Sequence, residues 1–136
     1  MVHKRRIVAL TVAGISAESG LSTFAGGKWE QYDIMEVASS DGWNKNPEMM
    51  IRFYNERRKQ LEGVEPNAAH LILAELEKDF DVTVITQNVD NLHERAGSTK
   101  IIHLHGEITK VRSSQHPNMV FDIGYSLQQY IERVNH

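Results

Sequence analysis

The sequence contains no cysteine, which excludes disulfides, thiolate zinc sites and cysteine nucleophiles. No apolar run approaches the roughly 18–20 residues that cross a bilayer. The apolar run nearest the N-terminus, residues 7–10, is too short for the core of a signal peptide. Charge of one sign is not in excess, since the net charge is −3 without a block of like charges. We therefore expect neither nucleic acid nor a membrane as a partner, and the cytoplasm as the default compartment.

The elements that the sequence does contain alternate between strands and helices. Short β-branched or apolar runs predict strands at 7–10, 82–86 and 101–104, and helical spacing predicts helices at 47–62, 67–76 and 91–96. A loop rich in glycine and serine is expected over 14–27, and a short amphipathic helix over 126–135. This order is typical of an α/β fold, here a partial Rossmann-like, doubly wound parallel sheet in one domain.

The helix that begins at Pro47 has a broad apolar face. Its members share helical spacing: Met50, Phe53, Tyr54, Arg57 and Leu61. Glu56, Arg58, Lys59 and Gln60 are expected to face mostly water.

Polar residues follow all three predicted strands, in the segments 11–20, 86–91 and 103–106. Ligands of open α/β sheets bind at the carboxyl ends of the strands, so these segments predict a pocket. Each has a plainer explanation: segment 11–20 can be a glycine-rich turn, Asp90 can cap the next helix, and His105 can be an ordinary surface histidine.

Three blocks resemble the signature blocks of the sirtuins, in the family's order and at about its spacing. They are Ala13-Gly14-Ile15-Ser16-Ala17-Glu18-Ser19-Gly20, Thr86-Gln87-Asn88-Val89-Asp90-Asn91-Leu92-His93 and His103-Leu104-His105-Gly106-Glu107. The resemblance covers roughly residues 5–125. It implies removal of acyl groups (succinyl, malonyl or acetyl) from lysines of proteins or peptides, with NAD as co-substrate and with nicotinamide and O-acyl-ADP-ribose released.

The resemblance also implies a role for each matched residue. The turn from Ala13 to Ser16 would meet the phosphates of NAD, Gln87 and Asn88 the ribose, and Asp90 the carboxamide. His105 would be the general base, with Asn88 as the second catalytic residue. The implied NAD-binding residues are Ala13, Gly14, Ile15, Ser16, Glu18, Phe24, Trp29, Gln87, Asn88, Val89 and Asp90.

A fourth block, Phe53-Tyr54-Asn55-Glu56-Arg57-Arg58, is similar to a helix of the sirtuins that remove succinyl and malonyl groups. The resemblance implies that Tyr54 and Arg57 bind the carboxylate of the acyl group. Residues three apart share a helix face, and arginine can grip a carboxylate with two hydrogen bonds. The plainer interpretation is that Arg57 belongs to a charged helix face.

The chain also departs from the family pattern. Val12 stands where the family has glycine, and the Arg-Asp pair that follows Phe24 in the family is missing. Ser113 falls where the first zinc-binding cysteine would sit, so we expect residues 113–136 to be a metal-free remnant of the small module, with no zinc. The later family blocks are not present. We therefore expect residues 1–136 to be the N-terminal part of a truncated catalytic domain.

Three alternatives remain open after these departures. The chain is a deacylase, or it is an inactive sirtuin fragment that acts as a nucleotide- or protein-binding module, or it is a structural fragment without a ligand. An incomplete sheet would leave an open strand edge and an uncovered apolar face, which a partner could cover.

Overall fold

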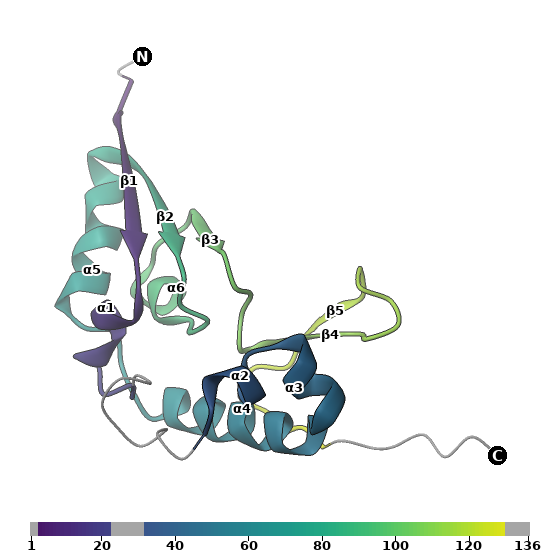
Figure 1. Ribbon diagram of the computed structural model, residues 1–136. Coiled ribbons are helices and arrows are strands. Elements are labelled where there is room, and N and C mark those ends of the chain that lie inside the picture. The colour runs from purple at the N-terminus through teal and green to yellow at the C-terminus, as the bar shows by residue number, and fades with distance from the viewer. Residues whose placement is uncertain (1–2, 23–31, 130–136) are drawn as a thin grey trace.

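The computed structural model describes residues 3–22 and 32–129, as three parallel strands with helices and a small hairpin (Figure 1). The elements in chain order are β1 (Arg5–Thr11), α1 (Ala13–Ala17), α2 (Ile34–Val37), α3 (Ser40–Lys45), α4 (Pro47–Glu62), α5 (Ala68–Glu75), the 3₁₀ turn η1 (Leu76–Lys78), β2 (Phe80–Thr86), α6 (Leu92–Ala96), β3 (Ile101–His103), β4 (Lys110–Arg112) and β5 (Val120–Asp122).

The sheet has the order β1-β2-β3, and both pairings are parallel. In the register, Thr11 lies opposite Thr86, and Thr86 lies opposite His103. The carboxyl ends of all three strands therefore meet at one edge, as the sequence predicts, and the α/β class with a parallel sheet is confirmed.

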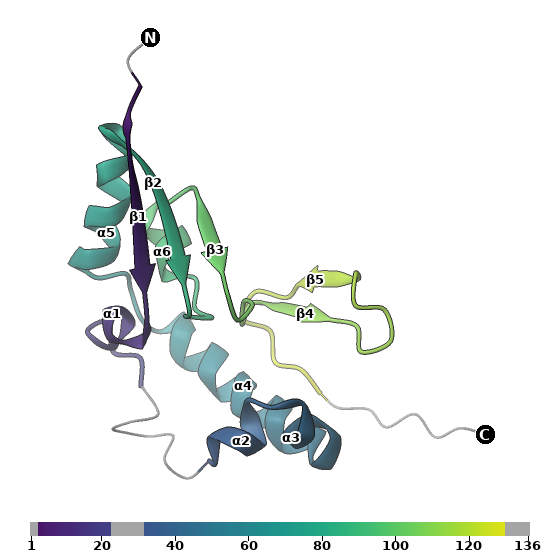
Figure 2. The same ribbon diagram turned by 45° about the horizontal axis from the view of Figure 1, so that its top comes forward.

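Among residues 3–22 and 32–129, one face of the sheet is covered and the other is exposed. Helices α5 and α6 pack together beside the sheet (Figures 1 and 2). The side chains of Val82, Val84 and Thr86 are buried. Alternate residues point to the opposite face, because side chains alternate along a strand. There the apolar side chains of Val8 and Leu10 are each 65% exposed, and those of Ile102 and Leu104 are also exposed.

Helix α4 forms a second layer with α2 and α3, below the strand ends (Figure 2). The side chain of Asn46 caps α4 by accepting from the amide of Met49 at 3.1 Å, and Pro47 follows as the first helical residue. The sequence prediction for Arg58 is wrong: its side chain is only 4% exposed and donates to the carbonyl of Ile108 at 3.1 Å. Arg58 thus ties α4 to the loop after β3.

Several other predictions differ from the structure. The expected loop over 14–27 begins as helix α1, which has no side-chain cap and contains Gly14. Tertiary contacts compensate for its low propensity, since Asn67 Nδ2 donates to the carbonyl of Ile15 at 2.7 Å. Residues 126–129 are not helical, and the rest of the helix predicted over 126–135 lies outside the described residues. Within the described ranges, no helix combines the length and apolarity needed to cross a membrane.

Candidate active site

A set of buried polar side chains joins the ends of β1 and β2. The Oγ of Ser16, in α1, donates to Asp90 Oδ2 at 2.7 Å. The Nδ2 of Asn88 lies 3.4 Å from Ser16 Oγ and donates to the carbonyl of Val12 at 3.0 Å. All three of these side chains belong to buried residues. The polar segments after the two strands are therefore held in one hydrogen-bonded unit.

Asp90 has two structural roles in this unit. Its Oδ1 accepts from the amide of Leu92, the first residue of α6, at 3.1 Å, while Oδ2 receives the hydroxyl of Ser16. One oxygen of Asp90 therefore satisfies the first amide of α6, although the N-cap position itself is occupied by Asn91. A carboxylate has about four acceptor positions, so both oxygens keep lone pairs for a ligand.

Two buried histidines, His70 and His93, contact residues at the ends of β1 and α1, and the sequence analysis assigned a role to neither. His70 Nδ1 accepts from the amide of Asn67 at 3.1 Å, so Nε2 carries the ring proton and faces Ser16 Oγ at 3.5 Å. His93 Nε2 lies 2.9 Å from Thr11 Oγ1. The imidazole rings of His70 and His93 meet edge to face. Burial lowers the pKa of each ring, and the Asp90 carboxylate offsets part of that effect. The sequence signal for His70 is its place three residues after the capping Asn67.

A cavity of about 170 Å³ opens beside these groups. Seven of its lining residues are predicted site residues: Ala13, Ser16, Arg57, Gln87, Asn88, Val89 and Asp90. Leu21 and Ser22 complete the lining. Of the other predicted residues, Gly14, Ile15 and Glu18 belong to the same turn but do not line this cavity. Phe24 and Trp29 lie outside the described residues.

His105 lines a second, larger cavity of about 760 Å³ between α4 and the segment after β3. Its side chain is exposed, and Tyr54, Arg58 and Ile108 line the same cavity. Val89 lines both cavities, so they are neighbours. The structure therefore brings Asn88 and Asp90 into one cavity and His105 into the next.

Tyr54 and Arg57 lie within electrostatic reach of each other, as their spacing on α4 predicts. They line different cavities, however: Tyr54 the larger and Arg57 the smaller. Burial lowers the pKa of the Arg57 guanidinium, and attraction to Tyr54 and Asp90 opposes that effect. Burial raises the pKa of the Tyr54 phenol, and Arg57 opposes it. Arg57 therefore contributes positive charge to the cavity that contains Asp90.

The backbone conformation at Val12 shows whether valine fits where the sirtuin pattern has glycine. Val12 has φ −132° and ψ −178°, an extended conformation that any residue adopts. A β-carbon built at Gly14 would meet no atom within 4 Å, so the turn is open on that side. Valine therefore causes no backbone strain at this position.

Comparison with known proteins agrees with the sequence blocks and with the fold. The profile of the Sir2 family matches residues 12–132. The NAD-dependent protein deacylase of Helicobacter pylori strain J99 is 61% identical over 119 residues, which are 86% of this chain and 51% of the relative. The NAD-dependent protein deacylase of Bacteroides thetaiotaomicron is 62% identical over 115 residues, 83% of this chain and 49% of the relative. The chain thus spans about half the length of the curated relatives it matches.

A solved structure of a Sir2 homologue in complex with NAD has the same fold. It superposes with a TM-score of 0.82 at 42% identity, over 93% of this chain and 50% of that one.

Proposed function

The chain belongs to the Sir2 family, and from this premise we propose that it carries the nicotinamide-ribose half of the active site of an NAD-dependent protein-lysine deacylase. The buried unit of Ser16, Asn88 and Asp90 beside a cavity is the observation that carries the proposal. The relatives that bear this name support the proposed activity. Residues 113–136 are then a remnant of the small module, and the protein acts in the cytoplasm.

The residues of the smaller cavity fit NAD in their chemistry. Asp90 can accept from a carboxamide, Gln87 and Asn88 can bond ribose hydroxyls, and the open turn from Ala13 to Ser16 offers backbone amides to phosphates. Gly14, Ile15, Glu18, Val89, Phe24 and Trp29 complete the proposed NAD-binding set. NAD, when bound, supplies an electrophilic ribose carbon, so the protein needs no nucleophile of its own.

His105 is the proposed general base. An exposed imidazole just after β3 can accept a proton from a ribose hydroxyl, because a neutral imidazole has one ring nitrogen free to act as a base. Asn88 orients that ribose, and its own amide is oriented by the carbonyl of Val12. The acyl-lysine peptide enters through the larger cavity, where His105 and Tyr54 both lie.

Tyr54 and Arg57 are the proposed acyl-carboxylate site. The two cavities that they line share Val89, so a succinyl or malonyl group entering past Tyr54 approaches the guanidinium of Arg57. Arginine favours such a group because it can form two parallel hydrogen bonds with the carboxylate.

A second candidate function is a binding module without turnover. The exposed apolar face of Val8, Leu10, Ile102 and Leu104 favours it, because such a surface marks a contact with another protein segment. In that case the site binds a nucleotide or the chain binds a protein partner.

One experiment separates the two functions. The chain is incubated with a succinyl-lysine peptide, with and without NAD, and the peptide mass is followed beside a His105→Ala variant. We expect loss of the succinyl group that needs both NAD and His105. A thermal shift with NAD is measured in parallel. A shift without turnover supports the binding module. The absence of both a shift and turnover with the unmodified chain would contradict the deacylase and the nucleotide-binding form of the module.

A further inference from the structure

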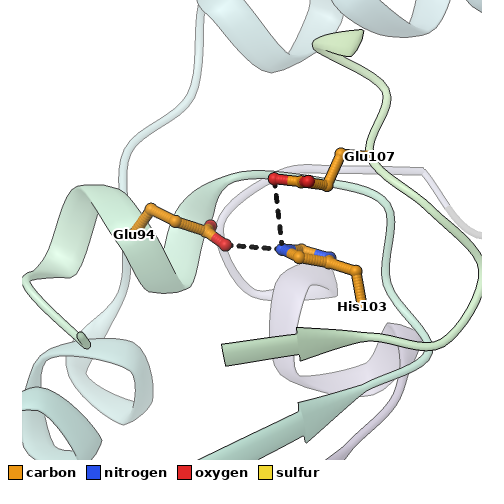
Figure 3. A group of neighbouring side chains, drawn as sticks. All are labelled: Glu94, His103 and Glu107. Atoms are coloured by element: carbon orange, nitrogen blue, oxygen red, sulfur yellow. Dashed lines mark hydrogen bonds and ion pairs between the residues drawn. The ribbon is translucent and has the colours of Figure 1, made fainter. Parts of the chain in front are cut away.

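Three side chains that can bind a metal ion converge beside the larger cavity, which Glu107 also lines (Figure 3). Glu94 comes from α6, His103 from the end of β3 and Glu107 from the loop that follows. His103 Nε2 lies 2.5 Å from Glu94 Oε1 and 3.8 Å from Glu107 Oε1. One ligand atom from each residue lies within 4.8 Å of the others. Both carboxylates therefore face the same nitrogen.

The orientation of His103 is fixed from its other side. Nδ1 lies 2.9 Å from the carbonyl of Asn88, and a carbonyl only accepts, so Nδ1 carries a proton. Nε2 lies 2.5 Å from a carboxylate oxygen that only accepts, so in the metal-free chain Nε2 donates to Glu94, and a bound ion would take the place of that proton. The side chain is only 8% exposed, so packing holds the ring. Histidines that bind metals are oriented in this way, by a hydrogen bond from the other ring nitrogen.

The carboxylate of Glu107 has a further partner, and the cluster is accessible. Lys110 Nζ contacts Glu107 Oε2 at 2.7 Å, which leaves Oε1 turned toward His103. Glu94, His103 and Glu107 line one open cavity of about 560 Å³, so an ion can reach all three.

We propose that Glu94, His103 and Glu107 form a site for a divalent transition-metal ion, with Zn²⁺ as the best fit. One imidazole and two carboxylates suit Zn²⁺, with bonds of about 2.0–2.2 Å and an open fourth position. Tetrahedral bonds of that length place ligand atoms about 3.3 Å apart, and the two observed distances lie on either side of this value. Binding displaces any proton on Nε2 into solvent.

The three residues of this site belong neither to the proposed NAD-binding set nor to the family's cysteine module, although Glu107 also lines the larger cavity. The expectation of no metal rests on the absence of cysteine, and the cluster uses none. A bound ion would cross-link α6 to the end of β3, and through Nδ1 it would brace the backbone of Asn88. It would therefore stabilise the edge of the sheet that carries the candidate active site.

The test is calorimetric titration of the chelator-treated, untagged 136-residue chain with zinc chloride near neutral pH. His103→Asn and Glu107→Gln each remove one ligand, and asparagine keeps a donor for the Asn88 carbonyl. Glu75→Gln removes an exposed carboxylate of another ion pair, and His116→Gln removes an exposed histidine. We expect one ion per chain, about ten-fold or more weaker binding in each cluster variant, and unchanged binding in both controls.

A second measurement needs no substitution. Zinc added to the unmodified chain should shift the imidazole ¹⁵N resonance of His103 Nε2 and leave Nδ1 bonded to the Asn88 carbonyl. An unchanged Nε2 resonance with zinc in large excess would mean that a proton is the only occupant, and the proposal would fail. It would equally fail if His116→Gln abolished binding while the cluster variants bound as tightly as the unmodified chain.

Discussion

The Asp90 carboxylate is oriented by a chain of hydrogen bonds that begins at a backbone amide. The amide of Asn67 fixes the ring of His70, His70 faces Ser16, and Ser16 donates to Asp90. Every residue in this series of hydrogen bonds is buried except Asn67, which is half-buried. A buried network that is nearly satisfied holds its members in one geometry, so the proposed carboxamide contact is preorganised.

The two buried histidines should titrate below the ordinary histidine pKa of 6.5, because burial disfavours their charged forms. Proton NMR of the ring C2–H signals against pH measures this directly. Asp90→Asn should lower both midpoints further, since the carboxylate favours the charged rings. A midpoint of His70 above 6.5 would contradict the buried, neutral ring.

The same shift has a defined sign in stability. Near and below pH 6.5 the unfolded chain binds more protons at these two positions than the folded chain does. Their contribution to the free energy of unfolding is therefore complete above pH 6.5 and is lost as the pH falls below it.

Arg57→Ala should weaken binding of a succinyl-lysine peptide by about 10–100-fold, because a hydrogen bond to a charged group contributes roughly 1.5–3 kcal/mol. Fluorescence anisotropy with labelled succinyl-lysine and acetyl-lysine peptides measures both affinities. The acetyl-lysine peptide should lose little. Lys59→Ala, an exposed cation on the same helix, is the matched control. Equal losses for the two peptides would rule out the carboxylate site.

The sequence predicts the site residues that belong to a local motif. Ser16, Asn88 and Asp90 stand in blocks that follow strands, and the parallel register brings those blocks together. Arg58 and His70 were not predicted, because their burial depends on partners far along the chain. Arg58 meets Ile108 from a position 50 residues earlier, and no local pattern encodes that contact.

At the scale of elements, the side chains that cap the helices differ in the number of hydrogen bonds they make to other elements. Asn46 caps α4 alone, whereas Asn67 caps α5 and also bonds the carbonyl of Ile15 and the hydroxyl of Ser19. Asn67 therefore joins α5 to α1.

Asn46→Ala should lower the free energy of unfolding by about 1 kcal/mol, the usual effect of losing a cap. Asn67→Ala should lower it by more, because it also removes the bonds to Ile15 and Ser19. Urea unfolding of both variants measures the difference. Equal effects would mean that the contacts to α1 add nothing.

Helices and strands with strong local signals match the prediction, and those held by packing do not. The helix predicted over 47–62 is α4, with the expected cap and proline at its start. The strand predicted over 7–10 is β1, extended by a residue or two at each end. Helix α1 was missed because glycine and serine are weak helix formers, and its contacts come from Asn67.

In the part of the molecule that the structure describes, the sheet has one covered and one uncovered face, and substitutions should distinguish them. Leu10→Thr and Ile102→Thr should change the free energy of unfolding by about 0.5 kcal/mol or less, because these side chains already meet solvent. They should also reduce fluorescence of the apolar dye ANS. Leu92→Ala, in the buried core, should cost about 2–5 kcal/mol. A loss of that size for Leu10→Thr would show that its face is covered.

Strand β1 pairs with residues of β2 that lie 75 positions later in the chain. At a synthesis rate of about 5–20 residues per second, this partner is made roughly 4–15 s after β1 itself. During that interval the backbone groups of β1 have no partner in β2. Within this sheet, β1 is therefore the strand that stays longest without a pairing partner after it is made.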